Sequence, residues 1–432
     1  MSDQTVSEGS TGQRNFRLSV ASGVFTQLAM NITNPSLVLS VFVRALGGSN
    51  TLVGSLSAIR FAGWFLPQFL VAGWVQPLRR KLPVAIALEV SRICVYATLA
   101  ILAYSLGLSN PALLLAIFFV LFTLSRLTAG ASGLARTDVI AKTVPPHRRA
   151  VFFATRNFWG SVVVFGAGIL VRVVLEEGRG WWFPANFTLL FGLSTLGLAI
   201  ALLFLLRVRE PAGPAGLPHY SLREQLARAP GLLRGDASYR RYMLARVLLN
   251  MTRLSAPFYP ILALDLLGAP PSMVGFYMAA MTLSRVLTNP LWQRLGRNRS
   301  NVYIVKASAL LTAVEPLAAA ALPWIIRLLG LSVESSGLLP AYLFTIVFLI
   351  AGSAESGRSI GLMSLVLDIA PDAERASYIG LVNTALGFVS LLSIAAGAAI
   401  DRVGFEPIFG LASILLLGGF VATLGWKGDR QS

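Results

Sequence analysis

Twelve predominantly apolar stretches follow one another along this chain, each long enough to cross a membrane as a helix. The hydrocarbon core of a bilayer is about 30 Å thick, and roughly 20 apolar residues in an α-helix span it. The stretches lack the alternation of β-barrel strands, and helices satisfy their own backbone hydrogen bonds in lipid. With 55% hydrophobic and 13% charged residues, the sequence predicts an all-α polytopic membrane protein with twelve transmembrane helices. The predicted spans are 17–43, 51–75, 82–106, 111–135, 151–175, 184–206, 241–264, 271–292, 302–326, 340–366, 376–400 and 406–426.

Lys and Arg outnumber Asp and Glu by 36 to 19, and they gather in alternate connections between the spans. Because basic residues are held back in cytoplasmic loops, we expect a cytoplasmic (inner or plasma) membrane protein with both termini in the cytoplasm. Membrane topology explains the basic excess, so no nucleic-acid partner is expected. The cytoplasmic side would carry Arg14, Arg17, Arg79, Arg80, Lys81, Arg136, Lys142, Arg148, Arg149, Arg294, Arg297, Arg299, Arg375, Lys427 and Arg430. The opposite side would carry Arg44, Arg172, Arg179, Arg327 and Arg402.

A short motif occurs twice, as LGGSNTLVG at 46–54 and as LGAPPSMVG at 267–275. Further landmarks repeat in the same order, and the two halves therefore read as pseudo-symmetric six-helix bundles. The repeated pairs at an offset of 226 are Pro145 and Pro371, Arg149 and Arg375, Ala150 and Ala376, Asn157 and Asn383, and Glu89 and Glu315. The predicted organisation is a polar cytoplasmic N-terminus (1–15), a first bundle (16–207), a cytoplasmic linker with an amphipathic helix (208–240), a second bundle (241–427) and a cytoplasmic tail (428–432). Ser221 and Glu224 form the predicted capping box of the linker helix.

This layout resembles the major facilitator superfamily of secondary transporters. The family's loop motif, G-x-L-A-D-R-x-G-R-R, is approached by NPLWQRLGRNR at 289–299 and more loosely by GWVQPLRRK at 73–81. The resemblance implies a cytoplasmic gate at these loops, formed by Arg79, Arg80, Gln293, Arg294, Gly296 and Arg297. The motif's acidic residues are missing, so the sequence does not show which residues would form the gate's usual salt bridge. At 73–81, a basic loop without a gating role remains the alternative. In SRLTAGASGLA, Arg126 and Gly130 match the antiporter motif R-x-x-Q-G, but its glutamine is replaced by Ala129.

Nine charged residues lie well inside predicted spans: Arg60, Glu89, Arg92, Arg126, Arg253, Arg285, Glu315, Glu355 and Arg358. Each would cost roughly 2.5–3.5 kcal/mol on a lipid-facing helix, so we expect them to face protein or water. Polar side chains also form helical stripes on the first and seventh spans. The family resemblance places spans 1, 4, 7 and 10 around a central cavity. The predicted substrate-binding residues are Gln27, Asn31, Asn34, Arg126, Arg246, Asn250, Arg253, Glu355 and Arg358.

These residues also have structural interpretations. The polar stripes could join helices by hydrogen bonds, and Glu355 could pair with Arg358 on its own helix. Glu355 is the first candidate for proton coupling, because a solute competing for its arginines would let it take up a proton. Glu89 and Glu315 are further coupling candidates, for which a structural role is favoured. Their suggested partners are Arg149, Arg375, Arg60 and Arg285.

The predicted function is secondary active transport by alternating access around a midplane site, with proton coupling as an open question. Arginines outnumber acids on the cavity helices, which favours a small anionic or zwitterionic solute. The alternatives are efflux of amphipathic compounds and a non-transporting scaffold of the same fold. His147 and His219 lie in loops and no phosphate-binding loop is present, so neither an enzyme activity nor a cofactor or metal site is expected. The expected partners are a small-molecule substrate and the lipid bilayer, with the protein as a monomer.

Overall fold

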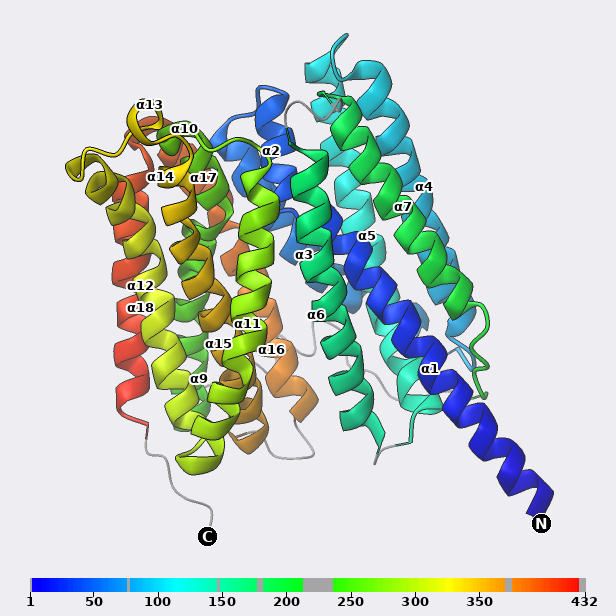
Figure 1. The fold of residues 1–432 in the computed structure, drawn as a ribbon. Helices are drawn as coiled ribbons and strands as arrows, with labels where there is room; N and C mark the ends of the chain where they lie inside the picture. Colours follow the sequence, from blue (N-terminus) through cyan, green and yellow to red (C-terminus); the bar gives the residue numbers. More distant parts are fainter. Residues whose placement is uncertain are drawn as a thin grey trace. The chain divides into compact units, whose positions relative to one another are not determined.

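The computed structural model describes residues 2–75, 78–145, 148–176, 182–212, 236–369 and 375–426. Within these ranges the regular structure is helical, and every predicted span lies on a helix or on consecutive helices (Figure 1). Nine of the described segments are long and apolar enough to cross a bilayer. The all-α, multi-pass fold expected from the sequence is therefore confirmed. The predicted linker helix with Ser221 and Glu224, His147, His219 and the tail lie outside the described residues.

The first six spans correspond to seven helices. Pro35 supplies no amide donor and disfavours helical geometry at Asn34, so the first span is interrupted there. The next span begins at Asn50, and the side chain of Asn110 caps a later helix by accepting from the Leu113 amide at 3.1 Å. The helices are α1 (Ser2–Ile32), α2 (Val38–Ala45), α3 (Asn50–Val75), α4 (Leu82–Leu106), α5 (Pro111–Thr143), α6 (Arg149–Val174) and α7 (Ala185–Leu205).

The seventh span is also interrupted, which the sequence analysis did not foresee. It consists of α9 (Ala237–Leu249), two short 3₁₀ segments, η2 (Asn250–Leu254) and η3 (Ala256–Phe258), and α10 (Tyr259–Leu267). Pro257 and Pro260 each remove a donor that a continuous helix would use. The remaining helices are α11 (Met273–Asn298), α12 (Asn301–Leu328), α13 (Val333–Ser336), α14 (Leu339–Leu343), α15 (Thr345–Ile369), α16 (Arg375–Ser390), α17 (Leu392–Val403) and α18 (Phe405–Leu424).

The helices form two compact units, Met1–Asn34 with Gly63–Ser221 and Pro35–Ala62 with Leu222–Ser432. In the first unit, α1 packs on α6 and α7, and α4 packs on α5 and α7. In the second unit, α12 packs on α15 and α18, and α11 packs on α15. The two bundles predicted from the sequence were continuous segments of the chain, 16–207 and 241–427, and these boundaries remain a prediction. The segment Pro35–Ala62 joins the second unit partly through α2, whose Arg44 forms an ion pair with Asp265 of α10.

The first turns of α3 are held by α17 within the second unit. Asp401 accepts hydrogen bonds from the backbone amides of Asn50 and Thr51, both at 3.0 Å, and from the Thr51 hydroxyl at 2.9 Å. A carboxylate at this position also interacts favourably with the α3 dipole. One turn further, the Ser393 hydroxyl donates to the Gly54 carbonyl at 2.8 Å. The two helices approach so closely that a Cβ atom on Gly54 would lie 2.0 Å from the Ser393 carbonyl oxygen.

The repeated Leu-Gly motif has a shared structural role. Gly47 follows α2 with φ of 80°, and Gly268 follows α10 with φ of 59°. Glycine adopts this left-handed conformation without the steric penalty of other residues and often terminates helices. The repeated Leu-Gly motif therefore marks the same kind of helix ending in both halves of the chain.

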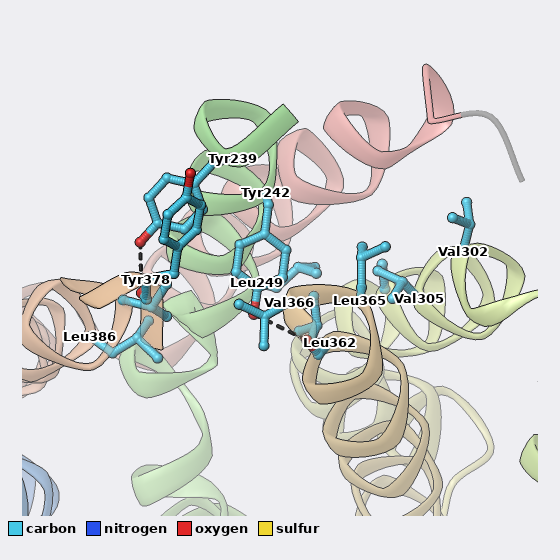
Figure 2. Close-up of a cluster of buried hydrophobic side chains, with 12 residues drawn as sticks. Tyr239, Tyr242, Leu249, Val302, Val305, Leu362, Leu365, Val366, Tyr378 and Leu386 are labelled. Atoms are coloured by element: carbon cyan, nitrogen blue, oxygen red, sulfur yellow. Dashed lines mark hydrogen bonds between the residues drawn. The ribbon is translucent and has the colours of Figure 1, made fainter. Parts of the chain in front are cut away.

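A buried cluster of side chains fixes α9 against α12, α15 and α16 (Figure 2). The rings of Tyr239 and Tyr378 lie 4.3 Å apart between centroids, and the Tyr239 hydroxyl donates to the Tyr378 carbonyl at 2.7 Å. The Tyr242 hydroxyl donates to the Leu362 carbonyl on α15 at 3.1 Å. Leu249, the last residue of α9, is fully buried in the same cluster. The cluster thus anchors the chain where the seventh span leaves α-helical geometry.

Candidate functional site

The interruption of the seventh span is bound by Arg358 of α15. Its guanidinium Nη1 donates to the Leu249 carbonyl at 2.9 Å and to the Thr252 hydroxyl at 3.3 Å. These bonds join α15 to the end of α9 and to η2. A guanidinium carries five donors, and Arg358 remains partly exposed. It can therefore hold the broken segment and still offer donors to a ligand.

Arg253, on η2, is the second cationic group at this place. Its guanidinium carbon lies 3.4 Å from the centre of the Phe61 ring, a stacked cation–π contact. Arg60, Arg246 and Arg358 are close enough to act electrostatically on it. Buried Nε atoms without a hydrogen-bond partner occur at Arg246, Arg253 and Arg285. This part of the second unit therefore concentrates positive charge with unused donors.

Glu355 of α15 pairs with Arg285 of α11, at 2.7 Å between its Oε2 and the arginine Nη2. The two side chains are 45% and 41% exposed, so the pair is accessible. Arg358 is directed to η2 instead, and the alternative of an ion pair between Glu355 and Arg358 on one helix is wrong. Asn250, predicted as a binding residue with Arg246 and Arg253, is the first residue of η2 and is partly exposed.

Glu315 lies on α12 and is 5% exposed. Its carboxyl group faces the Tyr259 hydroxyl, which shares a 2.9 Å hydrogen bond with the Ser255 hydroxyl. In the parts of the chain that the structure describes, no ion pair to Glu315 is formed. Arg285, one of its suggested partners, is the partner of Glu355.

Glu89, the counterpart of Glu315 in the first unit, is fully paired. Arg92 donates from Nη1 to both carboxylate oxygens, at 2.9 and 2.8 Å, and Arg136 lies at 3.3 Å. The Ser132 hydroxyl donates at 2.8 Å. The suggestion that Arg149 pairs with Glu89 is wrong, because Arg149 donates to backbone carbonyls of α5 and of the residue after it. The side chain of Arg375 lies outside the described residues.

Arg126 lies beside this cluster in the first unit. Its Nη2 donates to the Tyr96 hydroxyl at 2.8 Å and to the Met30 sulfur at 3.1 Å. Arg92 donates to the same sulfur at 2.9 Å. Arg126 is 8% exposed, so it is integrated into the packing of α1, α4 and α5.

The predicted polar stripe of α1 bonds mainly along its own helix. The Asn31 amide donates to the Gln27 carbonyl at 2.8 Å, and the Asn34 amide donates to the Asn31 side-chain oxygen at 3.4 Å. Gln27 is directed towards α6, where a Cβ atom on Gly160 would lie 2.0 Å from its Oε1. The structure thus brings these three residues together within the first unit.

The predicted gate residues lie at exposed ends of helices. Arg79 and Arg80 are exposed before α4, and Gln293, Arg294 and Arg297 are exposed near the end of α11. Gly296 is partly buried against the side chain of Ile304. Arg79 and Arg80 therefore lie in a connection as predicted, whereas the loop predicted at 289–299 is wrong, because α11 continues to Asn298.

An ion-pair network beside the first of these loops was missed in the sequence. Lys81 pairs with Asp138 of α5 at 2.8 Å, and Lys142 pairs with Asp138 at 3.2 Å and with Glu210 at 2.8 Å. Glu210, 8% exposed, also accepts from the amides of Lys81 and Leu82, at 2.8 and 2.7 Å. The acidic groups absent from the loop are therefore supplied by α5 and by the segment after α7. The i, i+4 spacing of Asp138 and Lys142 was the available signal.

Glu210→Gln is expected to destabilise the protein by about 1–3 kcal/mol, because the amide cannot satisfy two backbone donors and Lys142 as a carboxylate does. Thermal unfolding in detergent measures this change. Glu334→Gln, at an exposed position, is the matched control and should leave the melting temperature unchanged. Equal melting temperatures for the two variants would show that the network does not stabilise the fold.

The Major Facilitator Superfamily model matches residues 242–432 of this chain. Curated relatives include uncharacterized proteins of Mycobacterium tuberculosis and Mycobacterium bovis, each 24% identical over 292 residues and covering 66% of this chain. The chain spans about half the length of these relatives, 53% in each case.

Solved transporter structures share the fold across nearly the whole chain. A D-xylose–proton symporter has a TM-score of 0.70 at 15% identity, covering 97% of this chain and 98% of its own. A nucleoside transporter has a TM-score of 0.70 at 13% identity, with coverages of 95% and 99%. A bacterial homologue of the iron transporter ferroportin, in an inward-facing state, has a TM-score of 0.68 at 13% identity, with coverages of 97% and 99%. Within the described ranges of this chain, no group of three or more His, Cys, Asp or Glu side chains is placed to hold a metal ion.

Proposed function

We propose that this chain, a membrane transporter of the major facilitator type, is a secondary active transporter that moves a small anionic or zwitterionic solute by alternating access. The basic residues of its connections support a cytoplasmic membrane location with both ends of the chain in the cytoplasm. It would act as a monomer.

The observation that carries the substrate class is the excess of arginine around η2. Arg246, Arg253, Arg285 and Arg358 are opposed there by Glu315 and Glu355. The Nε atoms of three of these arginines are buried without a hydrogen-bond partner, and an acceptor that reached them would remove that desolvation cost. A desolvated guanidinium binds carboxylate or phosphate through two parallel hydrogen bonds, which a neutral or cationic solute cannot match. An anion bound here would also reduce the cost of burying the positive charge.

The fold alone does not select this class. Structural neighbours are named for a sugar, a nucleoside and a metal, and a POT family transporter is named in complex with 5-aminolevulinic acid, which carries both an amine and a carboxylate. The choice of an anion or zwitterion therefore rests on the arginines of this chain.

The first test is thermal stabilisation of the purified protein by organic anions, sugars, amino acids and cationic dyes, followed by counterflow in proteoliposomes with the stabilising compounds. Arg253→Gln is expected to weaken solute binding about 10- to 150-fold, the loss expected for a charge-assisted hydrogen bond of about 1.5–3 kcal/mol. Arg402→Gln, an exposed arginine at the end of α17, is the control and should bind normally.

Two results would contradict the proposal. Stabilisation by lipophilic cations alone would indicate efflux of amphipathic compounds. An absence of flux for every solute under every gradient would indicate a scaffold that retains the transporter fold.

A further inference from the structure

Glu315 occupies the centre of a long transmembrane helix. It is the fifteenth of the 28 residues of α12, about 20 Å from either end at 1.5 Å per residue. It is 5% exposed. An ionised carboxylate without a cationic partner is costly at this depth, which favours the protonated, neutral acid. Ionisable residues inside membrane helices usually have a function.

Glu89 and Glu355, the other two carboxylates discussed inside the spans, are neutralised by arginines. Glu89 has two arginine partners and a serine donor, and Glu355 has Arg285. Glu315 faces a hydroxyl group, that of Tyr259. A group that must gain and lose a proton in a transport cycle cannot be fixed permanently by a cation, and Glu315 meets this condition better than Glu89 or Glu355.

Charged and titratable groups approach Glu315 from the elements packed on α12. The α18 helix carries Glu406 in its first turn, where it is exposed, and no other charged residue within its bounds. On α11, Arg285 is engaged by Glu355, and on α9, Arg246 and Tyr242 act on one another. The groups that act on the Glu315 carboxyl are Tyr259 of α10, Arg253 of η2, and Glu355 and Arg358 of α15.

A continuous set of contacts leads from Glu315 to Arg358, one of the arginines around η2. The Tyr259 hydroxyl faces Glu315 and bonds with the Ser255 hydroxyl at 2.9 Å. The Ser255 amide donates to the Thr252 carbonyl at 3.1 Å. The Thr252 hydroxyl accepts from Arg358 at 3.3 Å. Tyr259, Ser255 and Thr252 all belong to the interrupted seventh span, so a shift of η2 alters the surroundings of both Glu315 and Arg358.

We propose that Glu315 is the proton-binding site of this transporter and that its protonation is linked, through Tyr259 and the η2 segment, to solute binding at Arg358. The carboxylate takes up one proton from water reaching the interrupted span when an anion neutralises Arg358, and it returns the proton to water when the anion leaves. The link to an anion rests on the function proposed above, whereas the proton site does not.

The test is infrared spectroscopy of the full chain in liposomes, without any solute, as the pH is varied. A protonated carboxyl group in a dry environment gives a carbonyl stretch band that exchanges slowly in D₂O. We expect Glu315→Gln to remove one such band and Glu315→Asp to retain it at a shifted frequency. Glu355→Gln, which leaves Glu315 intact, should retain the band as well. Absence of the band from the wild-type protein, or its persistence in a folded Glu315→Gln variant, would overturn the proton site.

A second part of the experiment tests the link between protonation of Glu315 and the charge at Arg358. Arg358→Gln removes a nearby positive charge that favours the ionised carboxyl, so the band should persist to higher pH than in the wild type. Arg402→Gln should not change this pH range, and an unchanged range in Arg358→Gln would overturn the link. Because neither part uses a solute, the outcomes separate the two proposals. Anion transport without the band refutes this inference alone, and the band without any solute flux refutes the transport proposal alone.

Discussion

Glu89→Gln is expected to destabilise the protein by about 3–5 kcal/mol, the range measured when one partner of a buried ion pair is removed. The substitution leaves Arg92, which is 3% exposed, and Arg136 without a compensating charge. An amide also cannot accept from Arg92, Arg136 and Ser132 as the carboxylate does. Thermal unfolding in detergent, with the fraction of monodisperse protein after heating, measures the effect.

Glu315→Gln supplies the matched comparison, because it makes the same change at the corresponding position of the second repeat. It removes no ion pair formed by the described residues and preserves an oxygen facing Tyr259, so it should lower the melting temperature much less. Equal losses in the two variants would mean that the different pairing of the two carboxylates has no energetic consequence.

Gly54→Leu is expected to abolish solute flux while leaving the protein folded. A Cβ atom at this position would lie 2.0 Å from the Ser393 carbonyl oxygen, so the first turns of α3 and α17 must separate. The contact lies within the second unit, so the substitution disfavours every state of the proposed transport cycle that contains it. Overpacking of about 1–3 kcal/mol corresponds to a change of about 5- to 150-fold in the balance of two states.

The measurement combines counterflow in proteoliposomes with maleimide labelling of Ser393→Cys in a Cys94→Ser background. Ser393 is fully buried, so faster labelling in the Gly54→Leu variant would report separation of α3 from α17. Gly410→Leu is the control, because nothing lies within 4 Å of a Cβ atom there. Normal flux in the Gly54→Leu variant would show that the α3–α17 contact is dispensable for transport.

The helices were predictable because long apolar stretches and the need for internal hydrogen bonding act locally along the chain. The duplication was predictable for a similar reason, since Gly47 and Gly268 are required by their backbone conformation. Pro257 and Pro260 are a local sequence signal for the interruption of the seventh span, because neither can donate a helical hydrogen bond.

Partners of the buried charges were less predictable. The sequence showed that Glu355 and Arg358 share a helix face, but α11 brings Arg285 to Glu355 and η2 attracts Arg358. Pairing between helices depends on their rotation and contact, which sequence spacing does not determine. Glu89 pairs with Arg92, three residues further along the same helix, rather than with the more distant arginines suggested from the sequence.

The first helix of each repeat is interrupted, at 33–37 between α1 and α2 and at 250–258 between α9 and α10. A backbone already released from i→i−4 bonding can change its torsion angles without breaking further helical hydrogen bonds. These two short segments are therefore the places where the first span of each repeat can bend at the smallest cost in helical hydrogen bonds. Within the second unit, the Arg44–Asp265 ion pair joins α2 to α10, so the helices that follow the two interruptions are tied to one another.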